Sequence, residues 1–250
     1  MTPATAPTTA WHLAVVGAGP VGLALALQAA RLMPHAHITL FDARPAERDV
    51  SADTRTLALS LGSLQFLQRL GVWQGVVLDK AAEPILQVHV SQMPPSLPAL
   101  LGEAEVRLTA QELGVPQLGA VIGYGALLAP LQRAWQAAVA AQPQRLHSRF
   151  GTAVAHIRAV PGGVELDTGT LEPFDLAVVA EGGVFAEQTR KPVVADYGQT
   201  AWVGTVTLAG AQSGMAFERF TRHGPAALLP LPQGAGGEQR AALVWCVPTL

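Results

Sequence analysis

Three closely spaced glycines interrupt an apolar stretch near the amino terminus, and they constrain the fold more than any other feature. Residues 12–16 (HLAVV) form a short aliphatic run typical of a buried strand, and residues 21–32 (VGLALALQAARL) have the composition of a helix. The strand and the helix are joined by residues 17–22, Gly-Ala-Gly-Pro-Val-Gly. Because glycine and proline weaken a continuous helix, we expect a strand, a turn and a helix here and not a membrane span.

Each glycine of this turn has its own physical reason in such a context. Gly17 permits a tight turn, Gly19 lets a pyrophosphate approach the main chain, and Gly22 lets the helix pack closely on the strand. The helix amino terminus offers unpaired N–H groups and a partial positive charge to phosphates. These three glycines and Pro20 are therefore candidate cofactor-binding residues.

A second apolar run, residues 37–45 (HITLFDARP), strengthens this interpretation. It predicts a buried strand that ends at Asp42, which follows Gly22 by 20 residues (42 − 22 = 20). A carboxylate at that strand end is placed to accept hydrogen bonds from a ribose hydroxyl. Arg44 is a further candidate for cofactor binding. The alternative is an aspartate that merely starts a turn, but the combined pattern favours a dinucleotide site, without separating FAD from NAD.

The composition excludes some classes of function. The net charge is −2 and no stripe of Lys and Arg occurs, so we expect no nucleic-acid partner. A single cysteine, Cys246, offers neither an internal disulfide nor a zinc site, so we expect no metal; a reducing cytoplasm fits this usage. The first ten residues lack the features of a signal or transit peptide, and we interpret them as a disordered leader.

The chain is also apolar for a soluble protein. Half of its 250 residues are hydrophobic, 14% are charged, and the mean hydropathy is +0.30. Two explanations stay open: a bias toward small aliphatic residues, or an apolar surface that meets a lipid-like substrate, a membrane or another piece of protein.

Residues 53–60 (DTRTLALS) and the helical run at 63–73 (SLQFLQRLGVW) resemble the flavoprotein aromatic hydroxylases, specifically their ubiquinone-biosynthesis branch. Residues 112–135 and 216–232, with LVWCVP shortly after, extend the resemblance, which runs from about residue 11 to the end of the chain. It implies an α/β fold, in which a Rossmann-like FAD-binding domain of the glutathione-reductase/p-hydroxybenzoate-hydroxylase type is interleaved with a mostly antiparallel β-sheet substrate domain.

The resemblance adds three candidate site residues. It places Arg55 near the ribityl and pyrophosphate part of a flavin, where a guanidinium donates to phosphate oxygens; the alternative is an exposed loop arginine. After the strand at 174–180 the family has Asp-Gly, whereas this chain has Glu181-Gly182. Glutamate keeps the charge but is one methylene longer. Tyr124 stands where related hydroxylases carry a flavin-contacting glutamine, so no role is transferred to it.

The elements expected along the rest of the chain are a strand at 84–92, a helix at 125–141 and a hairpin that turns at 161–163. Strands at 201–208 and 225–231 are expected to line an apolar substrate pocket. The domain boundaries that follow are a leader at 1–10, FAD-binding parts at 11–83 and 117–190, and substrate-domain parts at 84–116 and 191–250.

The resemblance implies an FAD-dependent monooxygenase that uses NAD(P)H and O₂, through a flavin hydroperoxide, to hydroxylate an aromatic substrate, here a prenylated phenol of the ubiquinone pathway. Expected partners are this small molecule and ubiquinone-pathway proteins, and the expected location is the cytoplasm, with peripheral contact at the inner face of the membrane. No catalytic residue is identified, because His223 is expected to face solvent and Arg219 and Arg222 to be surface charges.

Two alternatives stay open. The chain could be a dinucleotide-binding module without catalysis, since the family's later Gly-Asp motif has no match in it and we expect it to be cut short before that motif. An NAD-dependent dehydrogenase is the second alternative, against which the Arg55 segment and the absence of a polar catalytic cluster argue.

Overall fold

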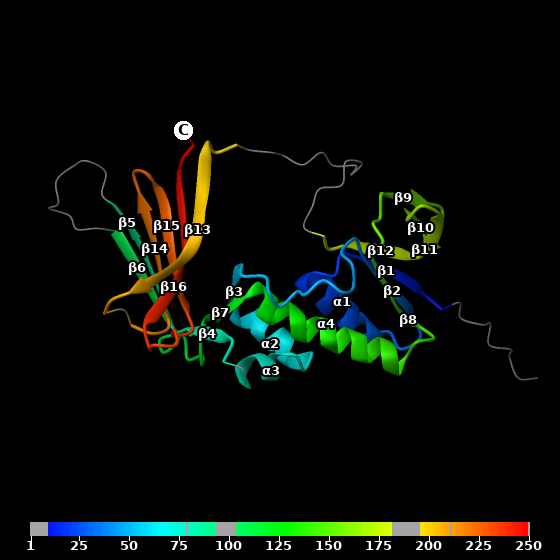
Figure 1. Cartoon of the computed structure of the whole chain (residues 1–250), viewed down its shortest axis with the longest axis horizontal. Helices are drawn as coiled ribbons and strands as arrows, with labels where there is room; N and C mark the ends of the chain where they lie inside the picture. The colour runs from blue at the N-terminus through cyan, green and yellow to red at the C-terminus, as the bar shows by residue number, and fades with distance from the viewer. Residues whose placement is uncertain (1–9, 79, 94–103, 182–195, 211, 250) are drawn as a thin grey trace, which may run out of the picture. The chain divides into compact units, whose positions relative to one another are not determined.

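The computed structural model describes residues 10–78, 80–93, 104–181, 196–210 and 212–249 (Figure 1). Within it the chain forms two compact units: unit 1 comprises residues 1–52 and 128–192, and unit 2 comprises residues 53–127 and 193–250. The predicted leader at 1–10 lies outside the described residues except for Ala10. Each unit is described separately below.

Unit 1 is built on a four-stranded parallel sheet in the order β12-β1-β2-β8. Its elements are β1 (His12–Val16), α1 (Pro20–Leu32), β2 (His37–Asp42), β8 (Leu146–Phe150) and β12 (Leu176–Val179). The predicted strand, glycine turn, helix and second strand are thus confirmed. The strands form because aliphatic runs bury almost completely, with Val15, Val16, Ile38 and Leu40 all at 0% exposure.

Unit 1 also contains a three-stranded antiparallel sheet. It consists of β9 (His156–Val160), β10 (Gly163–Asp167) and β11 (Leu171–Phe174), in the order β11-β10-β9. The predicted hairpin is confirmed, and Gly162 at its turn has a φ of 87°, which glycine adopts without strain. Leu166 of β10 packs with Phe41 and Val16, so this sheet shares a core with the parallel sheet.

Unit 2 contains a small antiparallel sheet in the order β3-β7-β4, with two helices near it in sequence. The elements are β3 (Thr56–Ser60), α2 (Leu61–Arg69), α3 (Trp73–Leu78), β4 (Ala82–Ile85) and β7 (Gly119–Gly123). The helical run expected at 63–73 is confirmed as α2, which ends at Arg69, while α3 begins at Trp73. Gly71, with a φ of 76°, lies between them and breaks the helical conformation.

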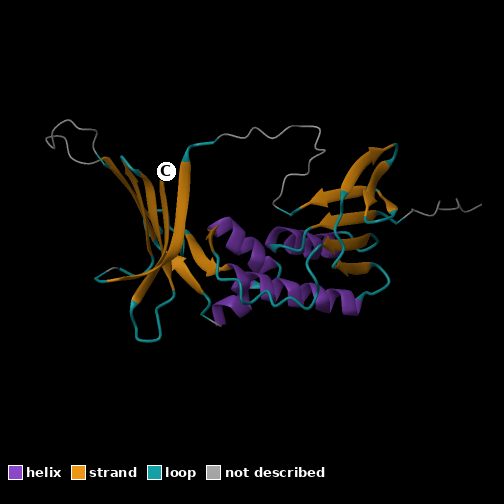
Figure 2. Ribbon diagram, turned by 45° about the horizontal axis from the view of Figure 1, so that its top comes forward, coloured by secondary structure: helices purple, strands orange, loops and turns teal. Residues whose placement is uncertain are grey.

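The second sheet of unit 2 has six strands in the order β13-β16-β15-β14-β5-β6. These strands are labelled in Figure 1 and drawn in orange in Figure 2. They are β5 (Gln87–Gln92), β6 (Ala104–Thr109), β13 (Gln199–Leu208), β14 (Met215–Thr221), β15 (Gly224–Leu231) and β16 (Gln239–Pro248). All neighbours are antiparallel except β14 and β5, so the predicted mostly antiparallel sheet is confirmed.

The prediction of one strand at 84–92 is wrong in one respect. The structure forms two strands there, β4 and β5, and they belong to different sheets. The chain changes sheets at Leu86, whose N–H donates to Gly214 O at 2.7 Å, and Gln87 N–H donates to the same oxygen at 3.1 Å. Alternating apolar residues continue through this point, so the pattern alone does not reveal the break.

Helix α4 (Tyr124–Ala141) confirms the predicted helix, and the boundary between the units falls within it. The sequence patterns do not predict strands β3, β6, β7 and β8. Contacts within the fold place residues 53–83 in unit 2, whereas the sequence-based domain boundaries assign these residues to the FAD-binding part. That assignment stays a prediction.

Among the residues described, none of the helices has the length and apolar character that crossing a membrane requires.

Candidate functional site

Three parallel strands of unit 1 place their carboxyl ends side by side, and the candidate residues lie there. Gly17 follows β1, Asp42 ends β2, and Glu181 comes shortly after β12. Because β12, β1 and β2 are adjacent and parallel, these residues share one edge of the sheet. Ligands of open α/β sheets bind outside this edge.

The glycine turn is too crowded for side chains at two of its positions. Gly17 has a φ of 104°, and a Cβ built on it would lie 2.8 Å from the Ala180 carbonyl carbon and from Glu181 N. A Cβ on Gly22 would lie 1.8 Å from Gly17 O. The roles expected for these two glycines, a tight turn and close helix packing, match this geometry.

Helix α1 begins at this turn without a side-chain cap. Gly19 is its N-cap residue, makes no capping side-chain bond, and is followed by Pro20 at the start of the helix. Leu23 N–H donates to Gly19 O at 3.0 Å, which starts the helical hydrogen-bonding pattern. An uncapped helix start presents main-chain N–H groups to a ligand, and an anion is the ligand its dipole favours.

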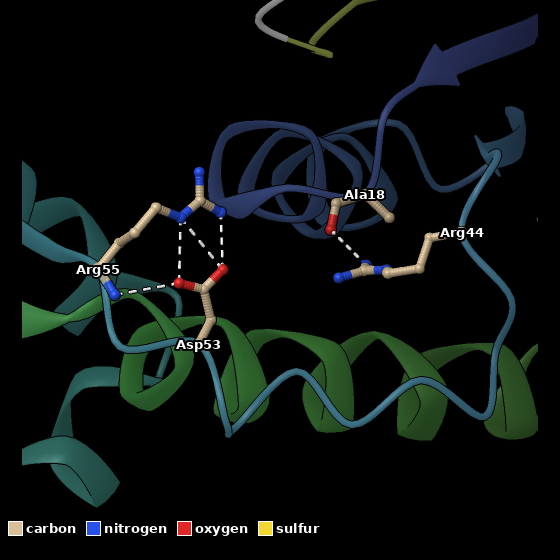
Figure 3. Close-up of polar contacts among 4 residues, drawn as sticks. All are labelled: Ala18, Arg44, Asp53 and Arg55. Atoms are coloured by element: carbon tan, nitrogen blue, oxygen red, sulfur yellow. Dashed lines mark hydrogen bonds and ion pairs between the residues drawn. The ribbon is translucent and has the colours of Figure 1, made fainter.

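Asp42 holds the turn through main-chain hydrogen bonds. Its Oδ2 accepts from Ala18 N–H at 2.6 Å, and its Oδ1 accepts from Arg44 N–H at 2.7 Å. Arg44 Nη2 donates to Ala18 O at 3.1 Å (Figure 3) and lies 3.8 Å from Asp42 Oδ2. The Asp42 and Arg44 side chains are both 17% exposed. Each carboxylate oxygen has a second lone pair, so Asp42 can hold the turn and still accept from a ligand hydroxyl.

Glu181 adds a second carboxylate at the same edge. Burial raises its pKa above the ordinary value of 4.5, and the nearby Asp42 carboxylate raises it further. A glutamate with a raised pKa carries less negative charge near pH 5 than a free one. Gly182, predicted together with Glu181, lies outside the described residues.

Arg55 belongs to unit 2, where it forms an organised cluster. Its Nη2 donates to Asp53 Oδ2 at 2.7 Å, its Nε donates to Asp53 Oδ1 at 3.0 Å (Figure 3), and its guanidinium carbon lies 4.2 Å from the Tyr124 ring centroid. Tyr124 N–H donates to Arg55 O at 2.6 Å and Gly125 N–H to Asp53 O at 3.2 Å. Asp53 raises the pKa of Arg55, whose side chain is 70% exposed.

The structure therefore brings Gly17, Gly19, Pro20, Gly22, Asp42, Arg44 and Glu181 together in unit 1, while Arg55 is part of unit 2. Sequence reasoning missed the main-chain role of Ala18 and the pairing of Arg55 with Asp53 and Tyr124. The Asp53–Arg55 pair has a sequence signal, since the two residues stand two apart in one motif. The Tyr124 contact has none, because it depends on the pairing of β3 with β7.

His223 is exposed in the turn between β14 and β15, as expected, and Arg222 beside it is also exposed. Arg219 is half-buried, and its Nη1 donates to Ser91 Oγ at 3.2 Å, so the expectation of a surface charge is only partly correct for it. All three residues belong to unit 2.

The fold is that of FAD-dependent hydroxylases. Klebsiella pneumoniae HpxO, solved with FAD and uric acid, superposes with a TM-score of 0.65 at 14% identity, covering 96% of this chain and 57% of that protein. The 2,6-dihydroxypyridine-3-hydroxylase of Arthrobacter nicotinovorans gives a TM-score of 0.59 at 17% identity, covering 97% of this chain and 57% of that one. No protein-family model matches the chain.

In sequence the chain is similar to 3-demethoxyubiquinol 3-hydroxylase of Escherichia coli K12. The identity is 27% over 245 residues, which is 94% of this chain and 56% of the relative. The resemblance to ubiquinone-pathway hydroxylases, the branch that includes 2-octaprenyl-6-methoxyphenol hydroxylase, is thereby confirmed. The chain spans just over half the length of the proteins it matches.

Proposed function

We propose that this chain is part of an FAD-dependent aromatic monooxygenase that hydroxylates a phenol of the ubiquinone pathway. The observation that carries the proposal is the edge of the unit 1 sheet, where a crowded glycine turn, an uncapped helix start and Asp42 converge. The similarity to 3-demethoxyubiquinol 3-hydroxylase and the fold shared with HpxO support it.

The residues present fit the adenosine diphosphate part of FAD. The start of α1 behind Gly19 would hold the pyrophosphate, and Asp42 would accept from a ribose hydroxyl through a free lone pair. Arg44, fixed against Ala18, would add positive charge beside the phosphates. Glu181, Gly182 and Arg55 are proposed as further contacts on the strength of the family resemblance.

When bound, FAD supplies the redox chemistry, in which NAD(P)H is the reductant and O₂ the source of the inserted oxygen. The protein's own contribution is to orient an electron-rich ring and to exclude water around it. A mostly apolar face of the six-stranded sheet suits this task. By the strand register, Val203, Phe220, Val106 and Leu108 lie on one face together with exposed Glu218, and each of the four apolar side chains is more than 40% exposed.

This apolar face also favours a prenylated substrate over a small soluble phenol. On the other face Trp202 and Trp245 are directly paired across β13 and β16, with exposures of 65% and 43%. Exposed tryptophans are typical of surfaces that meet a membrane interface. We therefore propose a cytoplasmic protein with peripheral membrane contact, where ubiquinone-pathway proteins would be its partners.

The test is FAD binding by the purified chain and by one matched pair of variants. Asp42→Asn removes an anionic acceptor from the turn, and we expect about tenfold weaker FAD binding, measured by quenching of flavin fluorescence. Asp49→Asn is the control, because exposed Asp49 accepts from Ser51 N–H two residues on, as Asp42 does from Arg44, but its other recorded hydrogen bond is from Ser51 Oγ, whereas that of Asp42 is from Ala18 N–H of the turn.

FAD-dependent oxidation of NAD(P)H, stimulated by a prenylated phenol, would extend the result from binding to activity. Tight binding of FAD and ADP without such oxidation would favour the dinucleotide-binding module instead. If neither variant differs from the parent, or the parent binds no FAD, the proposal is wrong.

A further inference from the structure

A cavity of about 540 Å³ lies entirely within unit 2, in a part of the chain to which the proposed function assigns no role. Its walls come from the start of α3, from β4 and β7, and from the chain next to β14 and β15. Small-molecule sites have volumes of roughly 300 to 1,000 Å³. The size of this cavity therefore suits a ligand of one ring with its substituents.

Three flat apolar side chains form part of the wall, which also includes the polar Gln117 and Gln233. Trp73, Pro84 and Pro232 line the cavity, and Trp73 is only 5% exposed, which fixes its indole in place. Ala82 and Ala120 are small and leave room between these rings. Aromatic and proline side chains present flat surfaces against which a planar ring packs with little loss of conformational entropy. The walls favour an aromatic ligand.

Two opposite charges point to the substituents such a ring would carry. Lys80 supplies an ammonium group and Glu83 a carboxylate, and both line the cavity. Ser213 Oγ donates to Glu83 Oε1 at 2.6 Å, which orients the carboxylate and leaves its other oxygen for a ligand. A ligand that matches both groups has an anion for Lys80 and a hydroxyl or amine donor for Glu83.

The backbone at Lys80 is unusual. Its φ of 50° is the one positive value among the described residues other than glycine. A long side chain in this region costs free energy, whereas glycine or asparagine would adopt it without strain. Such a residue is a candidate for a function that its side chain, and not its backbone, supplies.

We propose that this cavity is a binding site for a small aromatic carboxylate that also carries a hydrogen-bond donor. Lys80 binds the carboxylate, Glu83 accepts from the donor, and Trp73 with the two prolines packs against the ring. The proposal goes beyond the proposed function and does not depend on FAD binding.

Calorimetric titration with three probes tests the class of ligand. We expect 3-hydroxybenzoate to bind about tenfold more tightly than benzoate, which lacks the donor. Cyclohexanecarboxylate should bind roughly fivefold more weakly than benzoate, because it lacks the planar ring. Absence of binding by all three, or equal affinity for all three, would overturn the proposal.

Variants test the assigned residues. Lys80→Gly removes the ammonium group, and glycine adopts the positive φ without strain. The fold should therefore be retained while 3-hydroxybenzoate binds about tenfold more weakly. Lys80→Arg keeps the positive charge and should bind 3-hydroxybenzoate as the parent does. Glu83→Gln should abolish the preference for 3-hydroxybenzoate over benzoate. Arg48→Met, which removes an exposed cation of unit 1, is the control for general charge attraction.

An equal loss in Lys80→Gly and Arg48→Met would contradict a specific role for Lys80, as would unchanged binding by Lys80→Gly. FAD titration of the same samples keeps the two proposals apart. Intact FAD binding without benzoate binding rejects the cavity alone, and the reverse result rejects the cofactor site alone.

Discussion

Gly22 occupies a position where the turn and the helix leave no room for a side chain. A Cβ there would meet Gly17 O at 1.8 Å, a main-chain atom that cannot move aside without opening the turn. We expect Gly22→Ala to lower the free energy of unfolding by about 3 kcal/mol and to abolish FAD binding. Urea denaturation and FAD titration of the same variant measure both effects.

Gly62→Ala is the matched control for this substitution. Gly62 is an exposed residue of α2, and a Cβ there would meet only Ser60 Oγ, at 3.9 Å. Alanine should therefore raise the free energy of unfolding by about 0.5 kcal/mol, because it restricts the unfolded chain. Equal effects of the two substitutions would show that crowding at the glycine turn does not matter.

The same turn shows how far single residues can be interpreted from sequence. Asp42 was predicted as a ribose acceptor, and the structure adds that it also accepts from Ala18 and Arg44. Spacing along the chain predicts where a carboxylate lies relative to a strand end. It does not predict which of the nearby N–H groups that carboxylate accepts from.

Helix α1 ends on a buried arginine from a distant part of the chain. Arg145 is 8% exposed, and its guanidinium donates to three main-chain oxygens: Ala30 O at 2.7 Å, Ala36 O at 3.2 Å and Met33 O at 3.4 Å. A cation at this end also compensates the helix dipole. The carbonyl groups at the helix end are thus satisfied without a glycine cap.

Arg145→Met should lower the free energy of unfolding by about 3 kcal/mol, since it leaves buried carbonyl oxygens without donors. Arg133→Met, at an exposed position of α4, should change it by less than about 0.5 kcal/mol. Chemical denaturation of both variants measures these changes in the free energy of unfolding. A similar small change in each would mean that Arg145 does not support the helix end.

Three imidazoles form a row across the starts of β1, β2 and β8. His12 and His37 stack with ring centroids 4.8 Å apart, and His147 lies 6.5 Å from His37. Partial burial lowers the pKa of His37 below 6.5, and the neighbouring His12, His147 and Arg145 lower it further. The folded protein therefore binds a proton at His37 less readily than the unfolded chain does.

The sign of the pH dependence follows from this lowered pKa. Well above pH 6.5 His37 is neutral in both states and contributes nothing, whereas its contribution to stability should fall as the pH drops through 6.5. His37→Gln should reduce that loss, measured by urea denaturation at pH 7.5 and 5.5. Glu181, whose pKa is raised, acts in the opposite direction, so only the difference between parent and variant isolates His37. An unchanged slope in the variant would contradict the assignment.

For the molecule as a whole, ligand binding should appear as added stability. A ligand that binds only the folded chain raises its free energy of unfolding by about 2.7 kcal/mol at a hundredfold excess over Kd. We expect FAD and ADP both to raise the melting temperature, because both carry the adenosine diphosphate that the unit 1 edge fits. FMN, which lacks it, should not, and stabilisation by FMN alone would contradict this placement.

The sequence by itself determined the local features: the strand, glycine turn and helix at 12–32, the strand end at Asp42, helix 125–141 and the hairpin at 161–163. Each is encoded by residues close together in the chain, through hydrophobic periodicity and the conformational freedom of glycine. The resemblance to flavoprotein hydroxylases supplied the fold class, which the comparisons confirm.

Only the tertiary structure decided which distant segments meet. It split 84–92 between two sheets, placed Glu181 beside Gly17, put Arg145 at the end of α1, and joined Lys80, Glu83 and Ser213 around one cavity. The physical reason is that strand order and register arise from long-range hydrogen bonds and packing. A short apolar run is compatible with many partners, and only the folded chain selects one of them.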